Sequence, residues 1–158
     1  MTWTDGEIDG IVVRPLQQHS DSRGWLAELF RVDELPPGLT PAMGYVSVTH
    51  PRIGRGPHEH EEQTDLFGLL GPGDFRVIMW DNRETSPTYG HRKAIVCGES
   101  NPVLLIIPPG VVHGYINVSD KDAWVVNFPN SLFKGKGRGQ PVDETRYEGI
   151  KESPFRLE

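Results

Sequence analysis

The sequence predicts an all-β protein in which short strands close into a sandwich or barrel. Its apolar residues come in short runs of β-branched and aromatic type, and they almost nowhere recur at helical spacing. The 18 glycines and 14 prolines lie mostly between these runs, where they indicate turns. Many short strands separated by tight turns are typical of β-sandwiches and barrels.

Nine apolar runs are expected to form strands, and the clearest turns separate the later ones. Leu70-Gly71-Pro72-Gly73-Asp74 divides the fourth run from the fifth, and residues 85–90, Thr-Ser-Pro-Thr-Tyr-Gly, divide the fifth from the sixth. Ile107-Pro108-Pro109-Gly110 then divides the seventh from the eighth. In chain order, the expected strands are residues 11–14, 25–30, 45–49, 66–70, 75–80, 93–96, 103–107, 112–117 and 124–127.

Length and charge limit the class of protein. A chain of 158 residues suits one domain, residues 1–158, with a hydrophobic core of its own. A formal charge of -6 argues against nucleic-acid or anionic-membrane partners, because both require a basic face. No apolar run approaches the roughly 20 residues needed to span a bilayer, and the first ten residues do not look like a signal peptide. We therefore expect a cytoplasmic location.

The densest chemical signal is Gly54-Arg55-Gly56-Pro57-His58-Glu59-His60, which Asp65 follows five residues later. Side chains at positions i and i+2 of a strand point to the same face, so His58 and His60 are expected to share one side of a barrel wall. A plain alternative is a solvated strand edge rich in His and Glu. The run alone does not decide between these interpretations.

A second signal, Pro108-Pro109-Gly110-Val111-Val112-His113 followed by Asn117, favours a shared site. Together the two stretches resemble the paired motifs of the cupin superfamily, and the resemblance implies a double-stranded β-helix, or jelly-roll barrel. In metal-binding cupins the matching positions are ligands. Three imidazoles and one carboxylate suit a divalent transition metal such as Zn, Fe, Ni or Mn. Those positions here are His58, His60, Asp65 and His113.

More of the chain resembles one cupin family, the dTDP-4-dehydrorhamnose 3,5-epimerases. The resemblance runs in the family's order from Asp21-Ser22-Arg23-Gly24 to His113-Gly114-Tyr115, and its most specific stretch spans residues 81–90. It implies an enzyme without cofactor that acts on a nucleotide-linked sugar, with His58 as the base that removes protons beside the sugar's ketone. The residues matching the nucleotide-sugar pocket are Arg23, Glu28, Arg55 and His113.

The sequence also differs from this family at positions that matter for catalysis. The position of the family's catalytic tyrosine falls on or beside Asn127, where there is no phenol, and Asp65 replaces a lysine. The family's aspartate partner of the catalytic histidine has no counterpart, since the sequence ends soon after Phe155. A base of near-neutral pKa can still remove a proton α to a ketone, but inversion needs an acid on the opposite face. Partial chemistry is therefore expected.

His58-x-His60 is also similar to the His-x-His of sugar 3,4-ketoisomerases, so both histidines are candidate catalytic residues. Three functions remain open: an epimerase or isomerase of a dTDP-linked 4-keto-6-deoxy sugar, a metal-dependent cupin, and a sugar-binding cupin without activity. The first is preferred because the resemblance extends well beyond the histidines. A homodimer is expected as well, because the epimerases pair through their sheets and pairing covers exposed strand edges.

Overall fold

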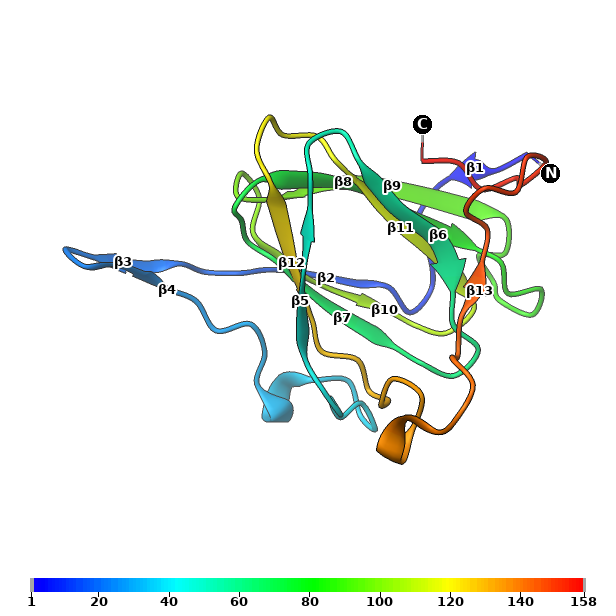
Figure 1. Cartoon of the computed structure of the whole chain (residues 1–158), viewed down its shortest axis with the longest axis horizontal. Helices are drawn as coiled ribbons and strands as arrows, with labels where there is room; N and C mark the ends of the chain where they lie inside the picture. The colour runs from blue at the N-terminus through cyan, green and yellow to red at the C-terminus, as the bar shows by residue number, and fades with distance from the viewer. Residues whose placement is uncertain (1, 158) are drawn as a thin grey trace.

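Two β-sheets face each other in the computed structural model, which describes residues 2–157 (Figure 1). The hairpin of β3 (His19–Asp21) and β4 (Gly24–Leu26) lies outside both sheets, and only two short 3-10 turns, η1 (Val32–Glu34) and η2 (Lys136–Arg138), interrupt the β-structure of the described residues. The all-β jelly-roll prediction is confirmed.

The six-stranded sheet has the order β1 (Thr4–Asp5), β9 (His91–Gly98), β8 (Asp74–Asp81), β11 (Val111–Asn117), β6 (Gly54–Glu59) and β13 (Thr145–Arg146). The five-stranded sheet has the order β2 (Val12–Pro15), β10 (Val103–Ile107), β7 (Asp65–Leu69), β12 (Ala123–Asn127) and β5 (Tyr45–Thr49).

The main core fills the space between the two sheets. Phe75 and Val77 of β8, Leu105 of β10 and Leu69 of β7 have no solvent exposure and belong to one apolar cluster. Strands β7 and β10 are buried along their whole length, which explains their continuous apolar character in the sequence. Burial of this surface is the main force that holds the sheets face to face.

All nine predicted strands are present, and two of them, β5 and β10, have the predicted bounds. The prediction for residues 25–30 was too long, because β4 (Gly24–Leu26) ends early. Four strands were not predicted, namely β1, β3 (His19–Asp21), β6 and β13. Three of these are only two or three residues long, and β6 begins with Gly-Arg-Gly-Pro, a sequence that favours a turn.

The pairing of β6 with β11 places His58 opposite His113. The register shifts between His113 and Tyr115, next to Gly56. Gly56 has φ +82°, and a Cβ atom there would lie 2.8 Å from the carbonyl oxygen of His113. Only glycine fits this approach without strain, so the Gly-Pro pair in the first motif brings the two histidine strands together.

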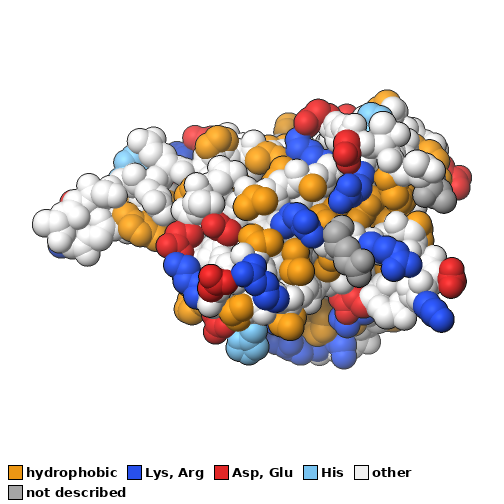
Figure 2. Space-filling model, turned by 90° about the horizontal axis from the view of Figure 1, so that it is seen from above, with side chains coloured by type: hydrophobic (Ala, Val, Ile, Leu, Met, Phe, Trp, Pro, Cys, Tyr) orange, Lys and Arg blue, Asp and Glu red, His pale blue; other side chains and the backbone are white. Residues whose placement is uncertain are grey.

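Strands β3 and β4 form an arm, residues 19–26, that extends away from the barrel (Figure 1). Its Trp25 and Leu26 side chains are 52% and 64% exposed. Figure 2 shows the arm as a protrusion from the body of the molecule. Among residues 2–157, no helix is long and apolar enough to cross a membrane.

Candidate active site

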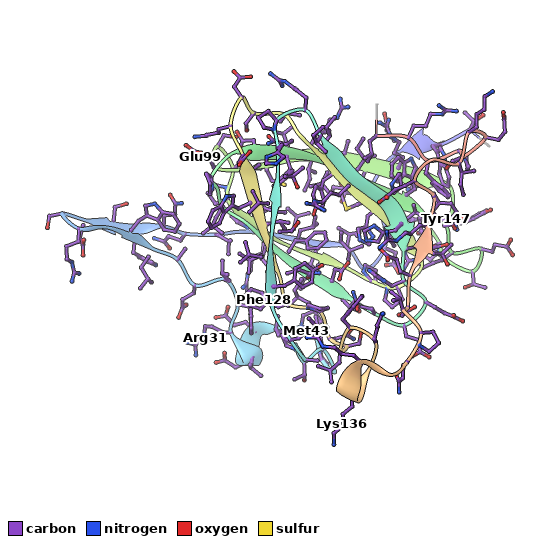
Figure 3. All side chains as sticks on the ribbon, viewed as in Figure 1. Arg31, Met43, Glu99, Phe128, Lys136 and Tyr147 are labelled. Carbon is purple, nitrogen blue, oxygen red and sulfur yellow. The ribbon has the colours of Figure 1, made fainter. Side chains whose placement is uncertain are left out.

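A cavity of about 630 Å³ opens between the two sheets at one end of the barrel. Tyr45 at the start of β5 and His58 and His60 at the end of β6 line it, together with the loop that follows β12. In Figure 3, Met43, another lining residue, lies at the same end of the barrel as Lys136 in η2. Lys134, Gly135, Arg138 and Gln140 also line the cavity, so the segment around η2 borders it.

The three predicted histidines and Asp65 form one cluster. One nitrogen or oxygen atom from each of His58, His60, Asp65 and His113 lies within 4.8 Å of the others. The rings of His58 and His113 are 4.5 Å apart between centroids, and those of His58 and His60 are 5.2 Å apart. His60 lies one residue beyond the end of β6, yet it faces the same cluster as His58. The shared site expected from the two motifs is present.

Asp65 is the centre of a buried hydrogen-bond network. Its Oδ2 lies 3.1 Å from Nε2 of His113 and 3.2 Å from Nε2 of His60. Its Oδ1 accepts hydrogen bonds from the side-chain amides of Gln63, at 2.8 Å, and Asn127, at 2.9 Å. Burial alone would raise the pKa of Asp65, but the bonds from His113 and His60 hold it well below its usual range. Asp65 is therefore an ionised carboxylate.

His58 and His60 have opposite charge preferences. Burial, together with the neighbouring His113 and His60 rings, lowers the pKa of His58 to about 2, so His58 is a neutral imidazole. Burial also opposes charge on His60, but the hydrogen bond to Asp65 outweighs it and the pKa of His60 is raised. The site without substrate thus keeps His58 unprotonated beside a second ring that favours its charged form.

The C-terminal segment completes the site from outside the barrel. Asp143 accepts hydrogen bonds at 2.8 to 3.0 Å from the backbone N–H groups of residues 61–63, and its own carbonyl oxygen contacts Nδ1 of His60. Glu144 lies 3.7 Å from Nδ1 of His58, and Arg146 pairs with Glu144 at 2.8 Å. The sequence comparison identified no carboxylate partner for His58, but the structure places Glu144 beside it.

The residues predicted to bind substrate lie in three different environments. His113 is buried below the cavity and donates to the Asp65 network. Arg55 donates to Oγ1 of Thr49 at 2.9 Å and to the carbonyl oxygen of Val48 at 2.8 Å, so it binds the end of β5. Neither side chain lines the cavity itself.

Arg23 and Glu28 lie away from the histidine cluster in the single chain. Arg23 is on the arm, pairs with Asp21 and has a side chain that is 87% exposed. Glu28 follows the arm and lies 3.7 Å from Arg31. The structure of one chain therefore does not bring these two predicted pocket residues to the cavity.

Sequence reasoning missed Tyr45 and Glu144. Tyr45 was predicted only as the first residue of a strand, although it lines the cavity and its hydroxyl lies 3.0 Å from the buried Asn127 amide. Glu144 is in an acidic segment without apolar pattern, and only its pairing beside β6 brings it to His58. Neither residue carried a motif that could have identified it.

These groups suit proton transfer at a carbon next to a carbonyl. A neutral imidazole can take the proton, and a neighbouring charged imidazole can stabilise the enolate that forms. The cavity lining includes the cationic side chains of Lys134 and Arg138, which can bind an anionic substrate, whereas Arg146 is paired with Glu144.

Comparison with known proteins identifies the family to which this chain belongs. The family model described as dTDP-4-dehydrorhamnose 3,5-epimerase matches residues 5–139. The chain is 39% identical over 123 residues to the spore coat polysaccharide biosynthesis protein SpsL of Bacillus subtilis, covering 77% of this chain and 79% of that protein. It is 37% identical over 127 residues to the probable low-salt glycan biosynthesis epimerase Agl13 of Haloferax volcanii, covering 80% and 81%. The crystal structure of a dTDP sugar isomerase from Desulfovibrio desulfuricans has a TM-score of 0.81 with 27% identity, covering 95% of this chain and 92% of that one.

Proposed function

Because this chain belongs to the dTDP-4-dehydrorhamnose 3,5-epimerase family, whose members are isomerases, we propose that it epimerises or isomerises a dTDP-linked 4-keto-6-deoxy sugar. The observation that carries the proposal is the position of the His58 imidazole, which lines the cavity 3.7 Å from the Glu144 carboxylate and beside the His60 and His113 rings. The named relatives SpsL and Agl13 belong to polysaccharide and glycan biosynthesis, which is consistent with such a substrate.

His58 is the proposed base. Its free ring nitrogen takes the proton from the carbon next to the ketone, and the bonding electrons move onto the ketone oxygen as the enolate forms. Glu144, 3.7 Å from Nδ1, stabilises the imidazolium that His58 becomes. His60, held by Asp65, is the nearby cation that can stabilise the enolate oxygen.

The nucleotide part of the substrate is assigned to the cavity opening. Lys134 and Arg138 present cationic groups there, and arginine binds diphosphate oxygens in a bidentate manner. Arg55 and His113 support the pocket from behind, through Thr49 and Asp65. We place the protein in the cytoplasm, because a sugar nucleotide is an anion that does not cross a bilayer unaided.

We also propose a homodimer, in which Arg23 and Glu28 reach the site of a second copy. The arm exposes Trp25 and Leu26, and the outer face of the five-stranded sheet exposes further apolar side chains. Pairing two chains would cover both surfaces. Sedimentation should give a dimer at micromolar concentration, and a monomer alone would contradict the proposal. The exposed apolar side chains of that outer face are Val12, Val46, Val48 and Trp124.

Deuterium exchange tests the catalytic proposal. Incubation with a dTDP-4-keto-6-deoxyhexose in deuterium oxide should place label at C3, C5 or both, and His58→Ala should abolish the exchange. His50→Ala is the matched control, since His50 is an exposed histidine with a side chain that is 79% accessible. Tight dTDP binding without exchange from any keto sugar would instead indicate a sugar-binding protein without catalytic activity.

A metal-dependent enzyme is the second candidate, and the four-residue cluster of His58, His60, Asp65 and His113 is the observation that favours it. Tetrahedral bonds of about 2.1 Å separate ligand atoms by about 3.4 Å, so the cluster would have to contract and exchange the Asp65 hydrogen bonds for metal bonds. Elemental analysis after purification without chelator distinguishes a metal-dependent enzyme from a metal-free one. Near-stoichiometric transition metal that is lost in His60→Ala would favour the metal enzyme, and its absence would leave Asp65 as a hydrogen-bonding residue.

A further inference from the structure

The proposed reaction needs a proton donor across the cavity from His58. Removal and return of a proton on the same face restores the starting configuration, so inversion requires an acid on the other face. Asn127, at the position where the resembling family has a phenol, cannot act as that acid, because a carboxamide does not release a proton near neutral pH. The inference below rests on the proposed function and concerns this missing group.

Tyr45 supplies a phenol beside Asn127. The two residues are direct partners in the pairing of β5 with β12, and the Tyr45 oxygen lies 3.0 Å from Nδ2 of Asn127. Tyr45 lines the same cavity as His58. His58 comes from β6 in the six-stranded sheet and Tyr45 from β5 in the facing five-stranded sheet. The base and the phenol therefore approach the cavity from opposite walls.

The direction of the hydrogen bond leaves the phenol proton free. Asn127 donates through Nδ2, so the Tyr45 oxygen accepts, and within residues 2–157 the Tyr45 hydroxyl donates to no other group. The same amide group also donates to Asp65, which orients it towards both partners. A donor fixed on the phenol oxygen also stabilises the phenolate that remains after proton transfer.

We propose that Tyr45 is the proton donor that completes epimerisation in this protein, with Asn127 as the residue that positions it. His58 takes the substrate proton, and the electron pair of the broken C–H bond forms the enolate. Tyr45 then gives its hydroxyl proton to the same carbon from the opposite side, and that electron pair forms the new C–H bond. The phenolate regains a proton from water and His58 returns its proton to water, so no net charge or hydrogen is consumed.

Two other hydroxyl groups fit this role less well. Tyr115 is 5% exposed and packs in the core, where its ring lies 4.8 Å from Phe75 between centroids. Burial raises the pKa of both phenols, Tyr45 and Tyr115, that of Tyr115 to about 12, so access to the cavity is what distinguishes them. Ser131 lines the cavity, but its hydroxyl already donates to Oε1 of Gln63 at 2.9 Å. Of these three groups, only Tyr45 combines access to the cavity with an unused proton.

The Tyr45→Phe variant distinguishes the role of the proton donor from that of the base. The ring is kept and the proton is removed, so formation of epimerised product should fall by about 100-fold or more, in line with loss of a general acid. Wash-in of deuterium into the unepimerised sugar should stay within a few-fold of wild type, because His58 still removes the proton. Affinity for dTDP, measured by calorimetry, should be unchanged. Tyr115→Phe is the matched control and should epimerise like wild type.

The outcomes distinguish this inference from the proposed function. If wild type exchanges deuterium but Tyr45→Phe still forms the epimer at the wild-type rate, the assignment of Tyr45 is wrong while the proposed function stands. Loss of inversion in Tyr115→Phe, with Tyr45→Phe unaffected, would likewise overturn it. If wild type exchanges no label from any keto sugar, the proposed function itself fails, and the role of Tyr45 fails with it.

Discussion

Replacing Asp81 by Asn removes the carboxylate on which the loop after β8 depends. Its Oδ1 accepts from Nε of Arg83 at 2.8 Å, and its Oδ2 accepts from the hydroxyls of Ser86 and Thr88, both at 2.6 Å. The carboxylate has no solvent exposure. These contacts belong to the stretch of sequence that is most specific to the family, and they give that stretch a structural role in holding the turn.

The pKa of Asp81 gives the size of the expected loss of folding stability. Burial alone would raise it, but the hydrogen bonds from Arg83, Ser86 and Thr88 outweigh burial and lower it from 3.8 to about 2. At roughly 1.4 kcal/mol per pH unit, this difference corresponds to about 2 kcal/mol of stability. Because the folded-state pKa is depressed, the contribution is complete above the unfolded pKa and is lost as pH falls towards 2. At pH 3 about half should remain.

Urea unfolding followed by tryptophan fluorescence measures this difference. Asp81→Asn should lose about 2 kcal/mol at pH 7 and about half as much at pH 3, while its rate of deuterium exchange at 25 °C stays that of wild type. Glu84→Gln, an exposed carboxylate in the same loop without an ion pair among the described residues, is the control. A loss below about 0.5 kcal/mol, or a loss that is the same at both pH values, would refute the reasoning.

Three further changes test the core and the site. Leu105→Ala removes a side chain buried between the sheets, so urea unfolding should show that the free energy of unfolding falls by about 2–5 kcal/mol with an unchanged m-value. A fall below about 1 kcal/mol would show that neighbouring side chains fill the space. Asp65→Asn leaves His60 and His113 without their shared carboxylate, and the unfolding free energy should fall by about 3 kcal/mol at pH 7; an unchanged value would mean that the network adds no stability. Glu144→Gln removes a charge 3.7 Å from Nδ1 of His58, so the exchange rate should fall about tenfold or more while dTDP binding is kept, and an unchanged rate would remove Glu144 from the mechanism.

The sequence predicted strands well where a run of apolar or β-branched residues lies between turn residues, whether the strand is buried or partly exposed. Residues 45–49 and 103–107 are apolar or β-branched runs bounded by turn residues, and both strands have those bounds. It failed for β6, because Gly54-Arg55-Gly56-Pro57 has the local preferences of a turn. Only its pairing with β11 makes this stretch extended, and a pairing between distant segments leaves no trace in local propensity.

The sequence predicted the histidines of the site but not the residues around them. The two motifs identified His58, His60, Asp65 and His113, which the fold brings within 4.8 Å. Tyr45 reaches Asn127 only through the register of β5 on β12. Glu144 lies outside residues 5–139, the part that matches the family model, so the resemblance carried no information about it. Arg23 and Glu28 remain predictions that depend on a second copy of the chain.

The short strand β13 has a consequence for how activity and fold are lost. It pairs with β6 through only two residues, Thr145 and Arg146, and the hydrogen bonds of Asp143 hold the segment just before it. Such a segment opens with a smaller free energy than the barrel as a whole. When it opens, His58 loses Glu144 and His60 loses the Asp143 carbonyl oxygen, while the two sheets stay folded. We therefore expect increasing urea to abolish catalysis before it unfolds the core, and a bound sugar nucleotide to narrow the gap between the two transitions.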